Sequence, residues 1–322
     1  MSAGNLHPVE VYAVCAGVEG VPDGVHHFAP LEVGLTTLRT GAVNPRPGCT
    51  LVLTGIPWRT AWKYGERGFR HLYWDAGTML ANLLAMADAS ALDARVWTGF
   101  VDDDVARLVG VDCVTEFPLA LVSIGSQDAI DVPADLPPLD LDIEPISPHP
   151  IAFPLINQAQ QAGALADGTE VREWGAHAVD GSRSPSNVDP PTDATDESIE
   201  EIILRRGSTR IMRPETAPAS LLRWGMAVAA RPPPADFVAP GTTLLEHNLA
   251  VHGIEGVDPG AYRFWDGDLE LVGPGQFREI TQQLCLNQPL GGDSAYTAFH
   301  SADLDLVFDA LGARGVADRQ RV

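Results

Sequence analysis

The chain has 322 residues, of which 45% are hydrophobic and 20% charged, and its formal net charge is −22, from 43 acidic and 21 basic residues. This length and composition can fill a sizeable core and predict about two domains. The acidic balance excludes ordinary binding to nucleic-acid phosphates and disfavours an anionic membrane surface, because both need a basic face. A surface of hydrated carboxylates is typical of a salt-adapted, halophilic protein, which we expect in the cytoplasm.

Several classes of site are absent from the sequence. No basic segment followed by an apolar stretch predicts a secretory signal, and no run of about 18 apolar residues predicts a membrane span. The four cysteines are scattered without a CxxC pair, which predicts free thiols rather than disulfides or zinc ligands. No metal site is predicted, since the adjacent His26 and His27 would face opposite ways on a strand. HExxH, GxSxG and Walker-type loops are missing, which disfavours hydrolases and nucleotidases.

The first part of the chain mixes strands and helices. Three β-rich runs predict strands: 9–15, 50–54 and 118–124. Apolar residues at helical spacing predict a mostly buried helix over 75–92. A second, short helix is expected within 99–110, with Asp102 as its N-cap and acidic residues near its positive end. Residues 1–128 are therefore predicted to be an α+β domain.

The middle of the chain has a different composition. Residues 129–195 are rich in proline, aspartate and serine and predict a linker, with a short helix around "LINQAQQAGAL". A helix is expected after Asp196, because "ESIEEIILRR" places acids in its first turn and arginines in its last. Residues 196–322 are predicted to be a second domain.

An internal repeat relates the two domains. "GVEGVPDGVHHF" (17–28) and "GIEGVDPGAYRF" (253–264) match at six of twelve positions, and "YGERG" (64–68) has a later counterpart in "LGARG" (311–315). Two matched segments in the same order predict two copies of one unit, forming a pseudo-dimer. Both copies are expected to be incomplete, since the first has no counterpart of the helix at 196–210 and the second ends soon after its "LGARG" segment.

Five segments resemble, in order, the landmarks of the SagB/McbC-type branch of the nitroreductase superfamily: "SAGNLHPVEVYAV", "GVHHFAPLEVGLTTL", "WKYGERGFRHLYWDAGTMLANLLAMA", "TGFVDDDVARLVGVD" and "RRGSTR". The resemblance implies a nitroreductase-like fold, in which helices flank a central, mostly antiparallel sheet. It also implies an FMN cofactor and a dimer or a tandem pseudo-dimer.

The resemblance further implies that FMN contacts three segments: Ser2, Gly4 and Asn5; Gly99 and Phe100; and Arg205, Arg206, Ser208 and Arg210. Guanidinium forks and a hydroxyl suit a phosphate, and small residues let the backbone approach a planar ring. A backbone N–H at Gly99 would support charge that develops at the flavin ring. Each segment has a plainer interpretation: arginines that balance nearby acids, an ordinary turn before a strand, and a glycine that ends one.

Lys63 is the only lysine in the chain. In the azoline-oxidising members of the family that the chain resembles, a Lys-Tyr pair at this position is catalytic, which implies that role for Lys63 and Tyr64. Oxidation of a thiazoline or oxazoline to the azole sends a hydride to flavin and a proton to a base. A lysine can release and take up that proton, whereas an arginine cannot. The alternative is a surface lysine kept by chance beside a tyrosine that packs in the core.

The chain departs from the family pattern in two places. Residues 126–128 read Ser-Gln-Asp where a basic residue is common, and 238–251 lack the serine and asparagine arrangement of the first copy. Two function classes stay open. One is an FMN-dependent oxidoreductase acting on a small molecule or a peptide, either an azoline dehydrogenase or an NAD(P)H-dependent nitro or quinone reductase. The other is a non-catalytic remnant that serves as a structural module. A homodimer or a partner chain is expected to supply missing segments.

Overall fold

The computed structural model describes residues 2–43, 47–125, 128–133, 135–141, 143, 145–176, 182–183, 197–239, 241–265 and 267–315. The chain forms two compact units. Unit 1 contains Met1–Val179, Pro233–Phe237 and Asp305–Val322, and unit 2 contains Asp180–Pro232 and Val238–Leu304. This division differs from the predicted boundaries at 128/129 and 195/196. Much of the segment predicted as a linker belongs to unit 1, and two later segments return to it.

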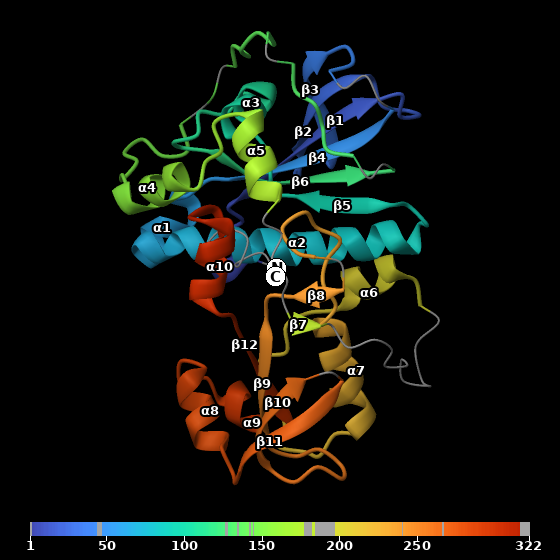
Figure 1. The fold of residues 1–322 in the computed structure, drawn as a ribbon, viewed down its shortest axis with the longest axis vertical. Coiled ribbons are helices and arrows are strands. Elements are labelled where there is room, and N and C mark those ends of the chain that lie inside the picture. The colour runs from blue at the N-terminus through green and yellow to red at the C-terminus, as the bar shows by residue number, and fades with distance from the viewer. Residues whose placement is uncertain are drawn as a thin grey trace. The chain divides into compact units, whose positions relative to one another are not determined.

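Unit 1 is built around a six-stranded antiparallel sheet with the order β3-β2-β1-β4-β6-β5, shown in Figure 1. Its strands are β1 (Val9–Ala16), β2 (Gly24–Ala29), β3 (Gly34–Thr40), β4 (Gly48–Gly55), β5 (Ala94–Trp97) and β6 (Phe117–Ile124). The three predicted strands are confirmed as β1, β4 and β6, and they lie side by side in the sheet. They carry most of the buried apolar residues of the sheet, as central strands do.

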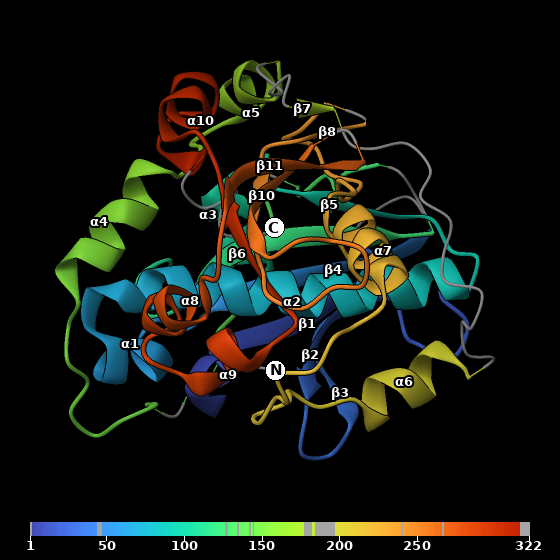
Figure 2. The ribbon, with the colours of Figure 1, turned by 90° about the horizontal axis from the view of Figure 1, so that it is seen from below.

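The helices of unit 1 are α1 (Trp58–Tyr64), α2 (Gly68–Ala89), α3 (Asp102–Val109), α4 (Pro154–Ala162) and α5 (Gly168–Gly175), with short 3₁₀ turns η1 (Ala3–Asn5) and η2 (Gly65–Arg67). The long helix predicted over 75–92 is confirmed as α2, but it begins earlier, at Gly68. A Cβ at Gly68 would lie 2.9 Å from the Cα of Ala61, so only glycine lets α1 and α2 approach this closely. In Figure 2, α2 lies in front of the sheet and α3 lies behind the sheet.

The core of unit 1 fills the space between α3 and the sheet. α3 contributes Val105, Leu108 and Val109, which pack against strand residues such as Tyr12 and Val52. The predicted short helix is thereby confirmed, but the cap assigned to it is wrong. Val101 is the N-cap and makes no side-chain cap, whereas Asp102 is the first helical residue and is only 3% exposed.

The segment predicted as a linker carries two helices that pack on unit 1. The helix expected near 155–165 is confirmed as α4, and α5 follows it with Asp167 as an N-cap that accepts from the backbone N–H groups of Thr169 and Glu170. Ile156 on α4 is 1% exposed and Trp174 on α5 is 8% exposed. These two apolar anchors explain why a segment with few periodic apolar residues still joins a core.

Unit 2 contains a four-stranded antiparallel sheet with the order β11-β10-β9-β12. Its elements are β7 (Ser182–Arg183), α6 (Ile199–Arg205), α7 (Ala219–Ala229), β8 (Thr242–Thr243), β9 (Glu246–Val251), β10 (Gly260–Trp265), β11 (Asp268–Pro274), α8 (Arg278–Leu284), α9 (Pro289–Asp293) and β12 (Tyr296–Ser301). The helix expected after Asp196 is confirmed as α6, with a capping box between Ser198 and Glu201. Leu222 and Met226 on α7 pack against Leu249 and Phe264 of the sheet.

The two sheets show the predicted repeat in three dimensions. β3-β2-β1-β4 in unit 1 corresponds in strand order to β11-β10-β9-β12 in unit 2, although α8 and α9 lie between β11 and β12 and the described residues between β3 and β4 contain no helix. The helix after β4 is α1, and the helix after β12 is α10 (Leu304–Leu311). Each helix ends before a glycine of positive φ, Gly65 at 58° and Gly312 at 59°. α10 differs from α1 in one respect, because most of it belongs to unit 1 although its strand β12 lies in unit 2.

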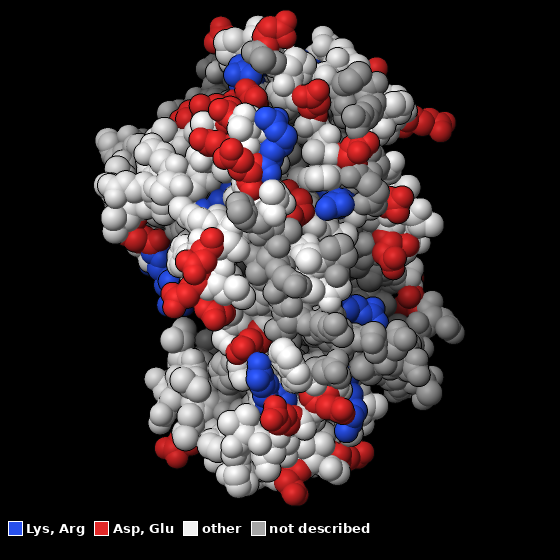
Figure 3. Space-filling view, viewed as in Figure 1, with Lys and Arg blue, Asp and Glu red and all other residues white. Residues whose placement is uncertain are grey.

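The surface carries the acidic character of the sequence. On the face drawn in Figure 3, carboxylates are spread over both units and basic side chains occur in isolated groups among them. Among the described helices, none combines the length and the apolar character that crossing a bilayer requires.

Three histidines of unit 2 are held in environments that disfavour their charged form. His247 on β9 and His300 on β12 are cross-strand partners whose Nδ1 atoms lie 2.7 Å apart. Burial, with His300 next to it, lowers the pKa of His247 to about 4, and burial lowers the pKa of His300. Burial and the nearby Arg278 lower the pKa of His252, whose ring nitrogens have no hydrogen-bond partner among the described residues.

We therefore predict that unit 2 loses stability on acidification. Between the unfolded pKa near 6.5 and the lowered folded values, the unfolded chain binds more protons, so the free energy of unfolding falls as pH falls through this window. The loss attributable to His247 is of order 1–3 kcal/mol. Thermal unfolding with amide hydrogen exchange at pH 7 and pH 5 measures it. His252→Leu should reduce the pH slope, whereas H149Q at an exposed site should not; equal slopes would contradict the prediction.

Candidate functional site

The N-terminal loop of unit 1 is fastened to α2 by one carboxylate. Ser2 Oγ donates a hydrogen bond to Asp75 Oδ2, and the backbone N–H of Ala3 donates to Asp75 Oδ1 over 3.0 Å. Asp75 is 6% exposed, so it is a buried anchor on the helix. The loop that was expected to contact a planar cofactor is thus held in a fixed position against the helix that follows the Lys-Tyr pair.

The same loop contains residues with left-handed backbone. Gly4, Asn5 and His7 have φ of 64°, 60° and 47°. The conformation is closed by hydrogen bonds from Asn5 N–H to Ser2 O at 3.0 Å and between His7 Nε2 and Asn5 Oδ1 at 3.0 Å. Glycine and asparagine tolerate this region, which explains their place in the "SAGN" segment.

Lys63 and Tyr64 lie at the C-terminal end of α1, directly against this loop. A Cβ built on Gly4 would lie 2.6 Å from the Tyr64 hydroxyl oxygen and 2.9 Å from Lys63 Nζ. Lys63 Nζ in turn lies 5.3 Å from the centre of the Tyr64 ring. The structure therefore brings two of the predicted segments together. Because Gly4 has no side chain, the Lys63 amine and the Tyr64 hydroxyl can both lie against this residue.

His71 on α2 completes this group and was not anticipated from the sequence. Its ring lies 4.3 Å from the Tyr64 ring, centre to centre, and both its nitrogens are buried without a hydrogen bond in the described part of the chain. Burial and the positive charge of Arg67 lower the pKa of His71, opposed by Asp75 one turn along the helix. A neutral imidazole thus supports Tyr64. The four-residue spacing between His71 and Asp75 was the signal in the sequence that could have identified His71 as part of the site.

A cavity of about 490 Å³ opens beside the loop, and we call it the loop cavity. Ser2, His7 and Asp75 give it a polar end. Its other walls are mostly apolar: Pro8, Val9, Val11, Phe28, Pro30 and Met79, with Glu10 and Arg59 at one side. A cavity of this size, with apolar walls and a few polar groups, suits a planar aromatic molecule of cofactor size.

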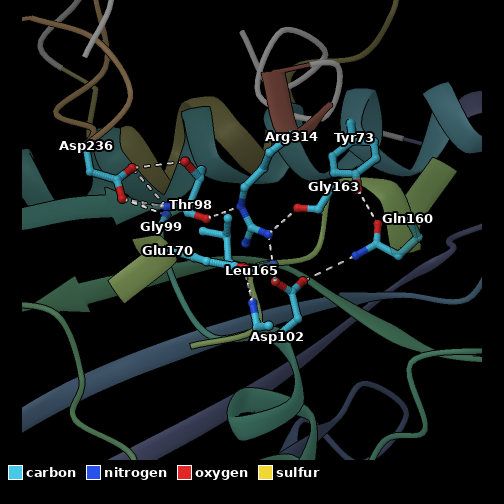
Figure 4. A network of polar contacts seen from close by, with 11 residues as sticks. Tyr73, Thr98, Gly99, Asp102, Gln160, Gly163, Leu165, Glu170, Asp236 and Arg314 are labelled. Atoms are coloured by element: carbon cyan, nitrogen blue, oxygen red, sulfur yellow. Dashed lines mark hydrogen bonds and ion pairs between the residues drawn. The ribbon is translucent and has the colours of Figure 1, made fainter. Parts of the chain in front are cut away.

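The turn at Gly99 is engaged by another part of unit 1. The backbone N–H of Gly99 donates to Asp236 Oδ2 over 2.7 Å, and that of Thr98 donates to both oxygens of Asp236 at 2.9 and 3.0 Å (Figure 4). A Cβ at Gly99 would lie 2.8 Å from the Trp174 ring, so α5 covers the turn as well. Phe100 is 6% exposed and lies beneath the guanidinium of Arg314 at 4.5 Å. The N–H predicted to face a flavin is thus bound to a carboxylate of this chain.

Arg314 ties this turn to the rest of unit 1, as Figure 4 shows. Its Nη1 lies 2.7 Å from Asp102 Oδ2, and the two side chains are 5% and 4% exposed. It also donates to the carbonyl oxygens of Thr98 at 2.6 Å and Gly163 at 2.8 Å. Asp102 accepts a further bond from the N–H of Leu165 at 2.9 Å. The two opposite charges are therefore paired with each other and held by further hydrogen bonds, as burial of an ion pair requires.

The predicted phosphate ligands lie elsewhere. Arg205, Arg206, Ser208 and Arg210 belong to unit 2, at and after the end of α6, and all four are exposed. Arg205 pairs with Glu197 at 2.5 Å, which is the charge-balancing role that was considered for it. The phosphate-binding role of the four residues stays a prediction.

Comparison with known proteins agrees with the fold. A sequence model of the nitroreductase family matches residues 2–126. McbC of Escherichia coli, named as a microcin B17-processing protein, is 30% identical over 143 residues, which cover 38% of this chain and 52% of McbC. MJ1384 of Methanocaldococcus jannaschii, named as a nitroreductase, is 27% identical over 138 residues, which cover 38% of this chain and 68% of MJ1384. The chain thus spans about half the length of McbC.

A solved structure extends the likeness of fold to the whole chain. The crystal structure of a protein from Anabaena variabilis, named as a nitroreductase, superposes with a TM-score of 0.73 over 100% of this chain and 71% of that one. The two are 20% identical in sequence. The predicted α+β, nitroreductase-like fold with two related sheets is therefore confirmed.

We predict that loss of the Arg314 guanidinium destabilises unit 1 strongly. R314M keeps much of the side-chain volume but leaves Asp102 buried without a countercharge, which costs about 3–5 kcal/mol. Urea unfolding followed by tryptophan fluorescence and hydrogen exchange in unit 1 measures this. R263M is the matched control, because its pair with Glu246 is exposed and worth about 1 kcal/mol or less. A loss for R314M no larger than that of the control would contradict the assignment.

Proposed function

We propose that the chain is an FMN-dependent oxidoreductase of the nitroreductase superfamily, in the branch that includes McbC, because a nitroreductase family model matches residues 2–126 and McbC is 30% identical over 143 residues. We propose further that it dehydrogenates a thiazoline or oxazoline ring of a modified peptide, with Lys63 and Tyr64 as its catalytic residues. The observation that carries the proposal is the contact of the "SAGN" loop with this pair, in which Gly4 leaves room for both functional groups.

The residues along one side of the loop cavity suit the binding of a flavin. Ser2 and His7 place polar atoms at one end of the cavity, and Gly4 and Asn5 belong to the same loop, where Gly4 faces the Tyr64 hydroxyl and Lys63 Nζ. These residues would hold the isoalloxazine ring, and Arg205, Arg206, Ser208 and Arg210, of this chain or of a second copy, would hold the phosphate. Contact through Gly99 and Phe100 would require Asp236 to leave the turn. FMN, when bound, supplies the acceptor for a hydride.

The proton chemistry belongs to the chain itself. Aromatisation of an azoline removes two hydrogens, one as a hydride and one as a proton. Lys63 Nζ takes up the proton from the ring carbon and passes it to solvent, which its exposed position allows. The Tyr64 hydroxyl orients the ring beside it, and His71 packs on Tyr64 and limits its rotation. Asp75 positions the loop through Ser2 and so fixes the distance between Gly4 and the pair.

The McbC match supports a peptide as the substrate, since McbC is named for processing microcin B17. The match to MJ1384, named as a nitroreductase, favours the alternative of NAD(P)H-dependent nitro or quinone reduction, which needs no protein base. A further candidate, besides the dehydrogenase and the reductase, is a structural module without catalysis. The carboxylate of Asp236 at the Gly99 turn favours it, because this contact fills a position at which a cofactor contact was expected.

We predict that K63R abolishes azoline oxidation and leaves FMN content unchanged. Arginine keeps the charge but cannot accept a proton, so the turnover of a thiazoline peptide should fall by about 10²-fold or more. Mass spectrometry of the product, which loses two hydrogens, measures the rate. R70K, the reverse exchange at an exposed position on α2, is the matched control and should act like the wild type.

Other outcomes separate the candidates. If K63R and the wild type oxidise the peptide at equal rates, the catalytic role of Lys63 is wrong. Reduction of nitro compounds by NAD(P)H with no azoline oxidation supports the reductase, and in that case K63R should retain activity. A protein that takes up no FMN under any condition supports the structural module.

A further inference from the structure

Unit 1 contains a second cavity, of about 560 Å³, which the proposed function does not use. We call it the segment cavity, because residues 143, 145–147, 150–153 and 157 form one of its sides. The lining also includes parts of β1, β2, the start of α1 and the approach to β6: Glu10, Tyr12, His27, Ile56, Pro57, Trp58, Arg59, Val114, Thr115 and Glu116. It meets the loop cavity only at Glu10 and Arg59, which line both.

One side of the segment cavity is apolar and accessible. Ile143 and Ile151 are 68% and 62% exposed, Ile146 is 42% exposed, and all three line the cavity together with Phe153. Val114 lies in a different part of the chain, shortly before β6. It is 47% exposed and also lines the segment cavity. Isolated exposed apolar residues need no explanation, but four that line one cavity indicate a surface made to cover an apolar body.

The polar residues of the cavity centre on Glu116. Its Oε1 accepts hydrogen bonds from the Tyr12 hydroxyl at 2.8 Å and from the Thr54 hydroxyl. Among the described residues, Oε2 accepts none. Burial raises the pKa of the Glu116 carboxyl, and the two hydrogen bonds and Arg59 oppose this rise. Glu116 is thus a carboxylate in an apolar setting with one oxygen available and no ion-pair partner of its own in the described chain.

The other charges of the cavity compensate one another. Glu10 Oε2 lies 2.8 Å from His27 Nε2, and Glu10 Oε1 pairs with Arg59 Nη1. Arg59 also donates to the carbonyl oxygen of His7 at 3.0 Å, which holds its guanidinium toward Glu10. The Arg59 guanidinium is therefore committed to Glu10, and Glu116 is the lining carboxylate without an ion-pair partner among the described residues.

We propose that the segment cavity binds a small organic amine, whose ammonium group pairs with Glu116 and whose apolar body lies against Ile143, Ile146, Ile151 and Phe153. A partly buried carboxylate without an ion-pair partner gains most from a ligand that brings a cation with hydrogen-bond donors. An ammonium group can donate to the available Oε2 while Tyr12 and Thr54 keep Oε1. The net charge of −22 favours the approach of a cation over that of an anion. This inference does not rest on the proposed function.

The test compares three probes of nearly equal shape by isothermal titration calorimetry: 4-phenylbutylamine, 4-phenylbutan-1-ol and 5-phenylpentanoate. The full chain should bind the amine saturably and roughly ten-fold or more tightly than the alcohol, and the anion least. E116Q should lose roughly ten-fold of the amine affinity and leave the alcohol unchanged, since glutamine still accepts from Tyr12 and Thr54. E173Q, at an exposed carboxylate on α5 away from the cavity, is the matched control and should bind like the wild type.

Val114→Trp adds a second arm that does not depend on the charge. A tryptophan at this exposed lining position fills the cavity, so it should abolish binding of both amine and alcohol while circular dichroism stays native. This variant carries the test if E116Q fails to fold. Absence of saturable amine binding, equal affinity for the three probes, an unchanged affinity in E116Q, or retained binding in the tryptophan variant would each overturn the proposal.

Discussion

The ion pair between Arg314 and Asp102 is the constraint on which unit 1 depends. Both side chains lie almost wholly out of water, so neither charge is tolerable without the other. The pair joins a residue after α10, near the end of the described chain, to the first turn of α3. Through the carbonyls of Thr98 and Gly163 it also fixes the β5–α3 turn and the end of α4. Segments separated by more than 200 positions in sequence are thereby bound to one centre.

The repeat explains how the same local pattern came to serve two purposes. α1 and α10 are equivalent helices, and each is followed by a glycine of positive φ and then an arginine, Arg67 or Arg314. Arg67 is exposed, whereas Arg314 is 5% exposed and paired. At the positions equivalent to Lys63 and Tyr64, the second copy has Ala310 and Leu311. The first copy thus keeps the groups proposed for chemistry, and the second copy supplies an anchor.

Periodic patterns accounted for the predicted elements. The β-rich runs of β1, β4 and β6, the apolar spacing of α2 and the repeated glycine hairpin could be recognised in the sequence because each is a local pattern. The partners of Asp102 could not be predicted in this way. An acidic residue at the start of a helix is ordinarily interpreted as an N-cap, and its ion pair with Arg314 is visible only in the folded chain. Asp236 and α5 were missed for the same reason, because their contacts at Gly99 depend on how the chain returns to unit 1. Lys63 and Gly4 were singled out from the sequence, but their contact is a result of the fold.

We propose that the loop cavity holds the flavin, that the N-terminal loop joins this cavity to Lys63 and Tyr64, and that the Gly99 turn stays closed by Asp236. Titration of the purified chain with FMN, followed by absorbance and by equilibrium dialysis, measures the stoichiometry directly. The account predicts one FMN per chain, with binding weakened by G4V and unchanged by D236N. No binding, or two FMN per chain with one of them gained or lost through Asp236, would contradict it.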